Sequence, residues 1–367
     1  MVHTRTPVID LYQLDAYDYS LPRALIAQTP IEPRDHARMM VLWPRICRWE
    51  HRRFYELPEF LHAGDVVVVN NTRVIPARMW GTLIRDDGTE SRVEVLLVRR
   101  VSAPDADPDT EVWIAMVRPG KKVRVGRQIQ FAPNVTARVE AITPEGYRVL
   151  RLTTDRPLRE FLESAGAMPV PPYIRRTHRD ERDFAWYQTV FAREEGSIAA
   201  PTAGLHFTPR VIAALRARGV HWCEITLHVG PGTFRPIRVR DIREHRIEPE
   251  WYTIPESVWD TIQTALRNGR RVLVVGTTTT RALESAAQHS PPRLQGWADV
   301  TIVPGYSFRV VRNLLTNFHL PRSSLLVLVC ALAGYACVMR AYREAVRRNY
   351  RFYSYGDCML ILHDTER

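Results

Sequence analysis

The sequence predicts an α/β domain that carries an inserted β domain of about six strands. Two observations support this. Between residues 65 and 154, short runs rich in β-branched residues follow one another with turns between them, which is typical of a small antiparallel barrel or sandwich. On both sides of that block, apolar strands alternate with helical patterns. We therefore expect a discontinuous α/β domain at residues 1–70 and 155–367, with the inserted domain at residues 71–154.

The first half of the chain contains three clear elements around the β-rich block. Residues 37–43 are apolar enough to indicate a strand. Four consecutive valines at 66–69 are apolar on both faces, as in a strand that is buried on two sides. Residues 157–166, PLREFLESAG, predict a helix that ends at Gly166.

The stretch at residues 196–238 alternates glycine-rich loops with regular elements. Pro209 begins a helix whose apolar residues recur at helical spacing, and a β-rich run follows at 222–229. The loops before the helix and after the strand contain His206 and His228 among Gly, Pro and Thr. In an open α/β layout such loops lie at one end of the strands, where ligands bind. The alternative is that these residues only form turns.

A second candidate site follows the strand predicted at 271–276, RVLVVG. A helix begins directly after it, among four threonines at 277–280. Free N–H groups and threonine hydroxyls at a helix N-terminus suit an anion or the ribose of a nucleotide, although ordinary capping is the alternative. The sequence contains neither a phosphate-binding P-loop nor a dinucleotide fingerprint.

The C-terminal part predicts one more helix before a final strand at 359–362, MLIL. The apolar run at 325–339 is shorter than the roughly 20 residues of a membrane span, so we expect one buried helix. Asn317 and His319 stand in the polar turn before it and are candidates to face its N-terminal end.

The net charge of +11 and the pI near 9.7 indicate a polyanionic partner, most simply nucleic acid. All basic residues except two lysines are arginine, which suits phosphate contacts, although a GC-rich genome produces the same bias.

In the C-terminal segment, arginines alternate with aromatic residues, as in proteins that bind single-stranded RNA; a solvated helix face packed by its aromatic residues is the alternative. These arginines are Arg340, Arg343, Arg347, Arg348 and Arg351. A basic edge is also predicted on the β domain, at Arg118, Lys121, Lys122, Arg124 and Arg127.

The five cysteines show neither C-x-x-C spacing nor a cluster with histidine, so we expect reduced thiols, a cytoplasmic protein and no metal site. The N-terminus lacks the apolar core of a signal peptide.

One further cluster, Glu244, His245, Glu248 and Glu250, combines carboxylates with an imidazole; it suits base catalysis or is simply solvated loop charge.

Five stretches are the most specific in the chain: AAPTAGLHF at 199–207, TLHVGPGTFRP at 226–236, VVGTTTTRALESAA at 274–287, TNFHLP at 316–321 and YSYGD at 353–357. Together and in this order, they resemble the S-adenosylmethionine:tRNA ribosyltransferase-isomerase family of queuosine biosynthesis. Upstream stretches at 18–30, 64–78, 168–174 and 187–192 resemble the same family.

The resemblance implies a barrel-like α/β main domain with an inserted antiparallel β-barrel of six strands. It implies an enzyme that transfers and isomerises the ribosyl part of S-adenosylmethionine onto 7-aminomethyl-7-deazaguanine at the tRNA wobble position. The implied products are epoxyqueuosine tRNA, adenine and methionine. S-adenosylmethionine is then a consumed co-substrate, no metal is needed, and the partner is the tRNA anticodon loop. We expect a monomer that does not bind membranes.

The matching motifs also imply roles for individual residues. His206 and His228 are expected to transfer or orient protons, and which of them is the base stays open. The family motif usually has a histidine where this chain has Glu248, so no essential role is expected there.

The alternatives to the enzyme are an inactive tRNA-binding relative, or an S-adenosylmethionine-using enzyme that acts on a small molecule. The expected co-substrate pocket comprises Thr202, Gly204, Gly230, Gly232, Thr233, Thr277, Thr278, Arg281, Glu284, Asn317 and His319.

Overall fold

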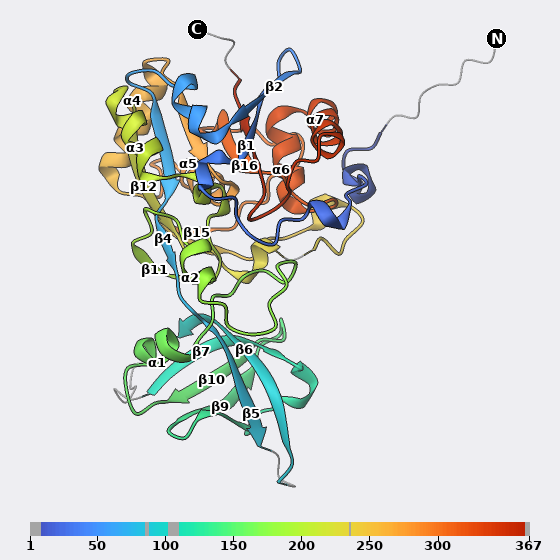
Figure 1. The fold of residues 1–367 in the computed structure, drawn as a ribbon, viewed down its shortest axis with the longest axis vertical. Helices are drawn as coiled ribbons and strands as arrows, with labels where there is room; N and C mark the ends of the chain where they lie inside the picture. Colours follow the sequence, from blue (N-terminus) through green and yellow to red (C-terminus); the bar gives the residue numbers. More distant parts are fainter. Residues whose placement is uncertain (1–8, 85–87, 102–109, 235, 364–367) are drawn as a thin grey trace, which may run out of the picture. The chain divides into compact units, whose positions relative to one another are not determined.

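The structure, a computed structural model, describes residues 9–84, 88–101, 110–234 and 236–363 (Figure 1). The chain divides into two compact units. The main unit comprises Met1–Thr72, Thr189–Glu194 and Ala200–Arg367, and the barrel unit comprises Arg73–Gln188 and Glu195–Ala199. In this division of the chain, the segment from residue 155 to Gln188 belongs to the barrel unit.

The main unit is built on a mixed sheet of nine strands, in the order β15-β13-β12-β3-β14-β16-β17-β1-β2. The central strand β3 runs parallel to both β12 and β14, and β14 runs parallel to β16. All five residues of β3 are buried, which confirms the two-sided burial predicted from its four valines. The strands are β1 (Arg38–Trp43), β2 (Arg48–Arg53), β3 (Val66–Asn70), β12 (His221–Leu227), β13 (Glu250–Thr253), β14 (Val272–Val275), β15 (Gln295–Ala298), β16 (Asn313–Asn317) and β17 (Cys358–Ile361).

Three helices of the main unit follow the predicted pattern: α3 (Pro209–Ala217), α4 (Glu256–Arg267) and α5 (Thr277–Ala287). Helix α3 has proline at its first position, and the side chain of Thr208 accepts the N–H of Val211 as an N-cap. The α/β class predicted for this part of the chain is confirmed.

The prediction of a single helix at residues 325–339 is wrong. Two helices, α6 (Ser324–Ala333) and α7 (Tyr335–Arg347), meet at Gly334, whose φ of 81° suits glycine and breaks the helix. Among the described residues, no single helix is long and apolar enough to cross a membrane; α6 and α7 reach that length and composition only as a pair bent by 120°.

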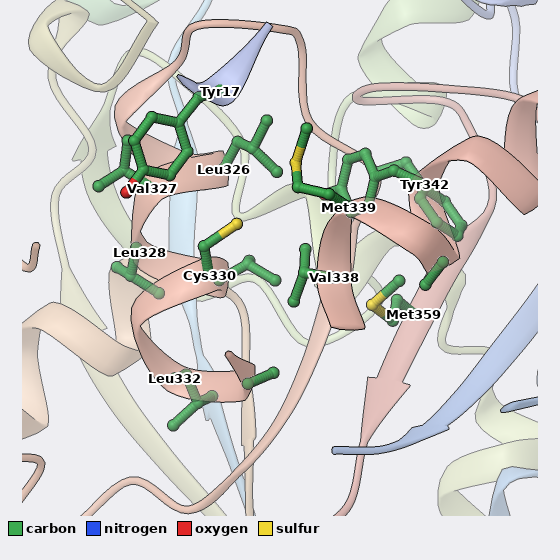
Figure 2. Close-up of a cluster of buried hydrophobic side chains, with 14 of the residues drawn as sticks. Tyr17, Leu326, Val327, Leu328, Cys330, Leu332, Val338, Met339, Tyr342 and Met359 are labelled. Carbon is green, nitrogen blue, oxygen red and sulfur yellow. The ribbon is translucent and has the colours of Figure 1, made fainter. Parts of the chain in front are cut away.

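Helices α6 and α7 enclose the larger core cluster of the main unit (Figure 2). Cys330 of α6 and Val338 of α7 point into this cluster together with Tyr17 and with Met359 of β17. The aromatic residues of the C-terminal segment are part of the packed interior, as in the alternative of a helix packed by its aromatic residues, while the RNA-binding role of the neighbouring arginines stays a prediction. The aromatic residues are Tyr342, Tyr350, Phe352, Tyr353 and Tyr355, all buried.

The expectation of five reduced thiols is wrong for one pair. Cys47, in the turn between β1 and β2, forms a disulfide with Cys337 in the first turn of α7, with a Cα–Cα distance of 5.5 Å. The two residues are 290 positions apart, so their spacing carried no signal. The other cysteines, Cys223, Cys330 and Cys358, are free and buried.

The barrel unit is a closed barrel of six antiparallel strands, as predicted, in the order β10-β7-β6-β5-β8-β9. Its core is continuous with the apolar face of α1 (Leu158–Ala165), which contributes Leu158, Phe161 and Leu162. The predicted helix end at Gly166 is confirmed. A short helix, α2 (Arg182–Trp186), follows. The strands are β5 (Arg78–Ile84), β6 (Glu90–Val101), β7 (Thr110–Arg118), β8 (Gln128–Ala132), β9 (Val135–Ile142) and β10 (Arg148–Thr153).

Candidate active site

Five separate segments of the main unit line one cavity. They carry mostly small, hydroxyl and amide groups, and the lining residues include no Asp, Glu, Lys or Arg. The cavity therefore offers hydroxyl, amide and imidazole groups beside apolar ones, and no charged side chain of the described residues lines it. The lining comprises Ala200, Pro201, Thr202, Ala203, Val229, Gly276, Thr277, Thr278, Thr316, Asn317, His319, Leu325, Tyr353 and Ser354.

The order of the strands explains why these segments meet. Strands β14 and β16 are parallel neighbours, so their carboxyl ends place Gly276 and Asn317 at the same edge of the sheet. Strand β17 runs antiparallel to β16, so the residues just before its first residue, Cys358, reach the same edge. Four of the loops that the sequence predicted as a site, at residues 200–203, 229, 276–278 and 316–319, therefore share one cavity.

The N-terminus of α5 lines this cavity, and several of its hydrogen-bonding groups have no partner in the described part of the chain. The first intrahelical bond runs from the N–H of Thr280 to the carbonyl of Gly276 (3.1 Å), and no side chain caps the helix. The N–H groups of residues 277–279 thus have no acceptor within the helix. The hydroxyl of Thr279 donates to Val275, whereas the buried Oγ1 of Thr278 has no partner in the described part of the chain.

Asn317 connects the cavity to the buried imidazole of His206. Its Oδ1 accepts the hydroxyl of Thr202 (3.2 Å), and its Nδ2 donates to the carbonyl of Tyr353 (3.1 Å). The same Nδ2 lies 3.3 Å from Nε2 of His206. Since the amide can only donate from Nδ2, Nε2 of His206 accepts, and a neutral ring then carries its proton on Nδ1.

His206 lies behind the cavity lining rather than on it. The ring packs against Phe54 at a centroid distance of 5.3 Å and is buried. Burial, together with the smaller effect of the positive charges of Arg34 and Arg351, lowers its pKa to about 3. The imidazole is therefore neutral at physiological pH, and it is a weak base.

His319 lines the cavity, but its backbone and side chain are held by several contacts. Its Nε2 lies 2.8 Å from Oγ1 of Thr316, and its N–H donates to the hydroxyl of Tyr342 (3.1 Å). The hydroxyl of Tyr19 donates to its carbonyl. Burial lowers the pKa of this histidine to about 3 as well.

His228 is the least buried of the three histidines and adjoins the lining residue Val229. Its Nδ1 lies 3.0 Å from the hydroxyl of Thr72, the first residue of β4 (Thr72–Val74), and that hydroxyl also donates to the carbonyl of Glu194 (3.3 Å). Burial lowers the pKa of His228, but the carboxylate of Glu194 acts in the opposite direction. Of the three imidazoles, this one has a nearby negative charge to stabilise its protonated form.

Two buried side chains hold the loop that begins at His228. Asn70 accepts the N–H of Leu227 (3.0 Å) and donates to its carbonyl (2.9 Å), which fixes the end of β12. Glu250 accepts the N–H of Gly230 (2.9 Å). The other oxygen of Glu250 pairs with Arg281 of α5.

Arg281 and Glu284, both expected in the co-substrate pocket, are not part of the cavity lining. Arg281 donates to the carbonyls of Val300 (3.3 Å) and Ala298 (2.6 Å) in addition to Glu250. Glu284 accepts the N–H groups of residues 309–311 and the hydroxyl of Tyr306. Both side chains therefore bind protein groups and support the loops around α5.

The expected glycines also lie beside the cavity rather than on it. A Cβ on Gly204, in the 3-10 helix η6 (Thr202–His206), would approach Phe191 to 2.8 Å, and one on Gly232 would approach Glu248 to 2.7 Å. Close packing therefore requires glycine at both positions, whereas Gly230 has more room. The side chain of Thr233, also expected in the pocket, lies outside the described residues.

The cluster at residues 244–250 does not contribute to the lining either. Glu250 is buried through its pair with Arg281, and Glu244 is exposed. The carbonyl of Glu248 lies 3.4 Å from the guanidinium of Arg281. The segment thus contributes a structural support through Glu250.

The C-terminal arginines differ in how their charges are compensated. Arg347 and Arg348 both pair with Glu344, and Arg351 donates to the carbonyl of Thr29. Arg340 and Arg343 are exposed, with no carboxylate partner among the described residues.

Comparison with known proteins agrees with this geometry. The family described as "Queuosine biosynthesis protein" matches residues 14–361. The chain belongs to this family. A relative from Moorella thermoacetica, named S-adenosylmethionine:tRNA ribosyltransferase-isomerase, is 47% identical over 95% of this chain and 100% of its own length. A relative of the same name from Desulfitobacterium hafniense is 44% identical with the same coverage.

A solved structure supports the same conclusion. The crystal structure of S-adenosylmethionine tRNA ribosyltransferase from Thermotoga maritima has a TM-score of 0.53 and 36% identity to this chain. The match covers 95% of this chain and all of the other. The fold of this chain therefore resembles that of a solved protein whose sequence matches it almost throughout.

Sequence reasoning from residue types missed several groups around the cavity. Tyr353 was assigned to the RNA-binding tail, and Ser354 and Thr316 received no role, although all three line the cavity. The motifs TNFHLP and YSYGD contain all three residues, but residue type singled out only Asn317 and His319 in the first motif. Thr72 carried no signal of its own, because its contact with His228 depends on strand pairing far apart in the sequence.

Proposed function

We propose that this protein transfers and isomerises the ribosyl part of S-adenosylmethionine onto 7-aminomethyl-7-deazaguanine at the wobble position of tRNA, giving epoxyqueuosine tRNA, adenine and methionine. The relatives at 47% and 44% identity bear the name of that enzyme. The observation in this chain that supports the proposal most strongly is the set of unpaired donors at the N-terminus of α5, which face the shared cavity.

S-adenosylmethionine binds in that cavity as a consumed co-substrate. The free N–H groups of Thr277 and Thr278 and the hydroxyl of Thr278 suit an oxygen-rich part of the molecule, its carboxylate or its ribose. Thr202, Asn317 and His319 line the other side and suit further polar groups of the same molecule. Gly204, Gly230 and Gly232 shape the adjoining loops, while Arg281 and Glu284 position them. Thr233 belongs to the same loop as Gly232.

His228 acts as the base, and His206 orients the site through Asn317. The Thr72 hydroxyl gives its one hydrogen to Glu194, so Nδ1 of His228 donates to Thr72 and Nε2 is free to accept a proton. His206, with a pKa of about 3, is the weaker proton acceptor.

The reaction needs one proton acceptor and a site that excludes water. The positive sulfonium acidifies the adjacent ribose methylene, and His228 removes a proton there. Adenine leaves as the sugar rearranges, the aminomethyl nitrogen of the tRNA base attacks, and a ring hydroxyl closes the epoxide as methionine departs. None of these steps assigns a role to a metal.

The partner is the anticodon loop of tRNA, and we assign Arg340, Arg343, Arg347, Arg348 and Arg351 to contacts with its backbone. The strongest candidates among these residues are Arg340 and Arg343, which are exposed and unpaired in the described structure. Since every lining residue comes from the main unit of one chain, a monomer suffices. A tRNA substrate implies a cytoplasmic enzyme that does not act at a membrane.

Incubation with S-adenosylmethionine and tRNA carrying 7-aminomethyl-7-deazaguanine tests the proposal. We expect release of free adenine, and Thr278→Val should raise the KM for S-adenosylmethionine about tenfold, as loss of one hydrogen bond does. The affinity for tRNA should not change in that variant. Tight tRNA binding without adenine from the wild type would contradict the proposal and favour an inactive tRNA-binding relative.

A further inference from the structure

The barrel unit presents an exposed basic segment between β7 and β8, which we call the basic turn (residues 118–127). It contains five positive residues and no Asp or Glu in its sequence, RPGKKVRVGR. Lys121 and Lys122 are the only lysines in a chain with 51 basic residues. Together with Arg118 and Arg124 they are exposed. The segment is therefore a local concentration of positive charge.

Several other exposed cations of the barrel unit are paired with carboxylates. Arg100 pairs with Glu111 (3.2 Å), Arg182 with Asp180 (2.8 Å), and Arg159 with both Glu163 and Glu195. By contrast, four cations of the basic turn have no carboxylate within 4.0 Å among the described residues. These four are Arg118, Lys121, Lys122 and Arg124. Their charge is left for an external anion.

The backbone of the basic turn is fixed in place. Arg148, which is buried, donates to the carbonyls of Gly120 (2.6 Å) and Val123 (2.7 Å). The side chain of Val123 is fully buried in the core of the barrel. At the other end, the N–H of Gly126 donates to the carbonyl of Val139 (2.8 Å). The turn thus presents its cations from a rigid base, which reduces the entropy lost on binding.

We propose that the basic turn binds the phosphate backbone of the tRNA substrate. The turn contains no aromatic residue for stacking on bases, and unpaired lysines act as point charges that suit phosphates without reading sequence. The identity of the RNA rests on the proposed function. The contact is separate from the cavity, because every cavity residue belongs to the main unit and the basic turn belongs to the barrel unit.

The test compares two triple variants with equal loss of charge. Lys121→Ala with Lys122→Ala and Arg124→Ala removes unpaired cations from the basic turn. Arg100→Ala with Arg159→Ala and Arg182→Ala removes paired, exposed cations from the same unit. The tRNA dissociation constant is measured by fluorescence anisotropy at several salt concentrations. The first variant should weaken tRNA binding about tenfold or more. The slope of the logarithm of the binding constant against the logarithm of the salt concentration should become less steep by about 2, as expected for three lost phosphate contacts. The second should change both by much less.

Two further measurements separate the outcomes. Lys121→Arg with Lys122→Arg should retain wild-type affinity, since the charge is kept, and circular dichroism checks that every variant is folded. Adenine release at saturating tRNA should stay within about twofold of the wild type in the basic-turn variant. Equal affinities and salt slopes for the two triple variants would overturn the inference, even if the wild type releases adenine normally. If the wild type releases no adenine, the proposed function fails, while the binding data still decide the role of the basic turn.

Discussion

The hydroxyl of Thr72 lies 3.0 Å from Nδ1 of His228 and also donates to the carbonyl of Glu194. We propose that this contact orients the histidine that acts as the base. His228→Ala should therefore lower the rate of adenine release by at least about 100-fold, as loss of a general base does. Affinity for tRNA should stay within about tenfold.

Thr72→Val tests the same contact from its other side. It should lower kcat by about tenfold with little change in the KM for S-adenosylmethionine, whereas Thr72→Ser should retain most activity. Steady-state adenine release measures both constants. If Thr72→Val is as active as Thr72→Ser, the hydroxyl does not orient His228.

Asn317 is predicted to matter for stability as well as for activity. Asn317→Ala removes the partner of the buried Nε2 of His206 and of the carbonyl of Tyr353. We expect the free energy of unfolding to fall by about 1–3 kcal/mol, because buried polar groups lose their hydrogen bonds. Urea denaturation of the two proteins measures this. A stability equal to that of the wild type would mean that water replaces the amide.

The buried pair of Glu250 and Arg281 should be far more sensitive to single than to double substitution. Glu250→Leu leaves the charge of Arg281 buried without its partner, at a cost of about 3–5 kcal/mol. Arg281→Met in the same chain should restore much of that loss. A double-mutant cycle in urea measures the coupling, and additive effects would contradict a direct pair.

Acid should destabilise the protein through its buried histidines. Burial lowers the pKa of His319 to about 3 in the folded state, below the usual value of about 6.5 in the unfolded chain. Between these values the unfolded state binds the proton and the folded state does not, so stability falls with decreasing pH by up to about 1.4 kcal/mol per unit. His319→Gln should flatten that dependence between pH 6.5 and 4, while His221→Gln, at an exposed position, should not. Identical pH profiles for His319→Gln and the wild type would contradict this.

The C-terminal arginines should contribute unequally to tRNA binding. Arg340→Ala with Arg343→Ala removes uncompensated charge, whereas Arg347→Ala with Arg348→Ala removes charge that Glu344 already offsets. The first double variant should weaken tRNA binding more and reduce its salt dependence more. Turnover at saturating tRNA should be retained in both. A larger effect from the second pair would show that Glu344 does not hold these arginines in solution.

Some features were predictable because their signal is local. The valines of β3 appear as an unbroken apolar run because the strand is buried on two sides. The N-terminus of α5 is visible because a buried strand ends at Gly276 and threonines follow. Residue types also marked the loops after β14 and β16 as candidate sites, whereas their meeting at one edge follows from the parallel pairing of these strands, which the sequence did not predict.

Other features depend on contacts that a local pattern does not contain. The helix break at Gly334 was missed because α6 is apolar on all sides and shows no period that glycine would interrupt. The roles of Glu250 and Arg281 depend on the pairing of distant strands, as does the contact between Thr72 and His228. In the tail, the alternation of arginines with aromatic residues fitted an RNA-binding surface and a packed helix equally well, and only the core cluster shows that the aromatic residues Tyr342, Tyr350 and Phe352 pack inside.

The most direct test of the account is a crystal structure of the protein with S-adenosylhomocysteine, the unreactive relative of the co-substrate. We predict density for the ligand in the shared cavity, with one of its oxygen atoms within hydrogen-bond distance of the hydroxyl of Thr278 and its ribosyl part beside Asn317. Density for the ligand elsewhere, with Thr278 still unpaired, would contradict the account.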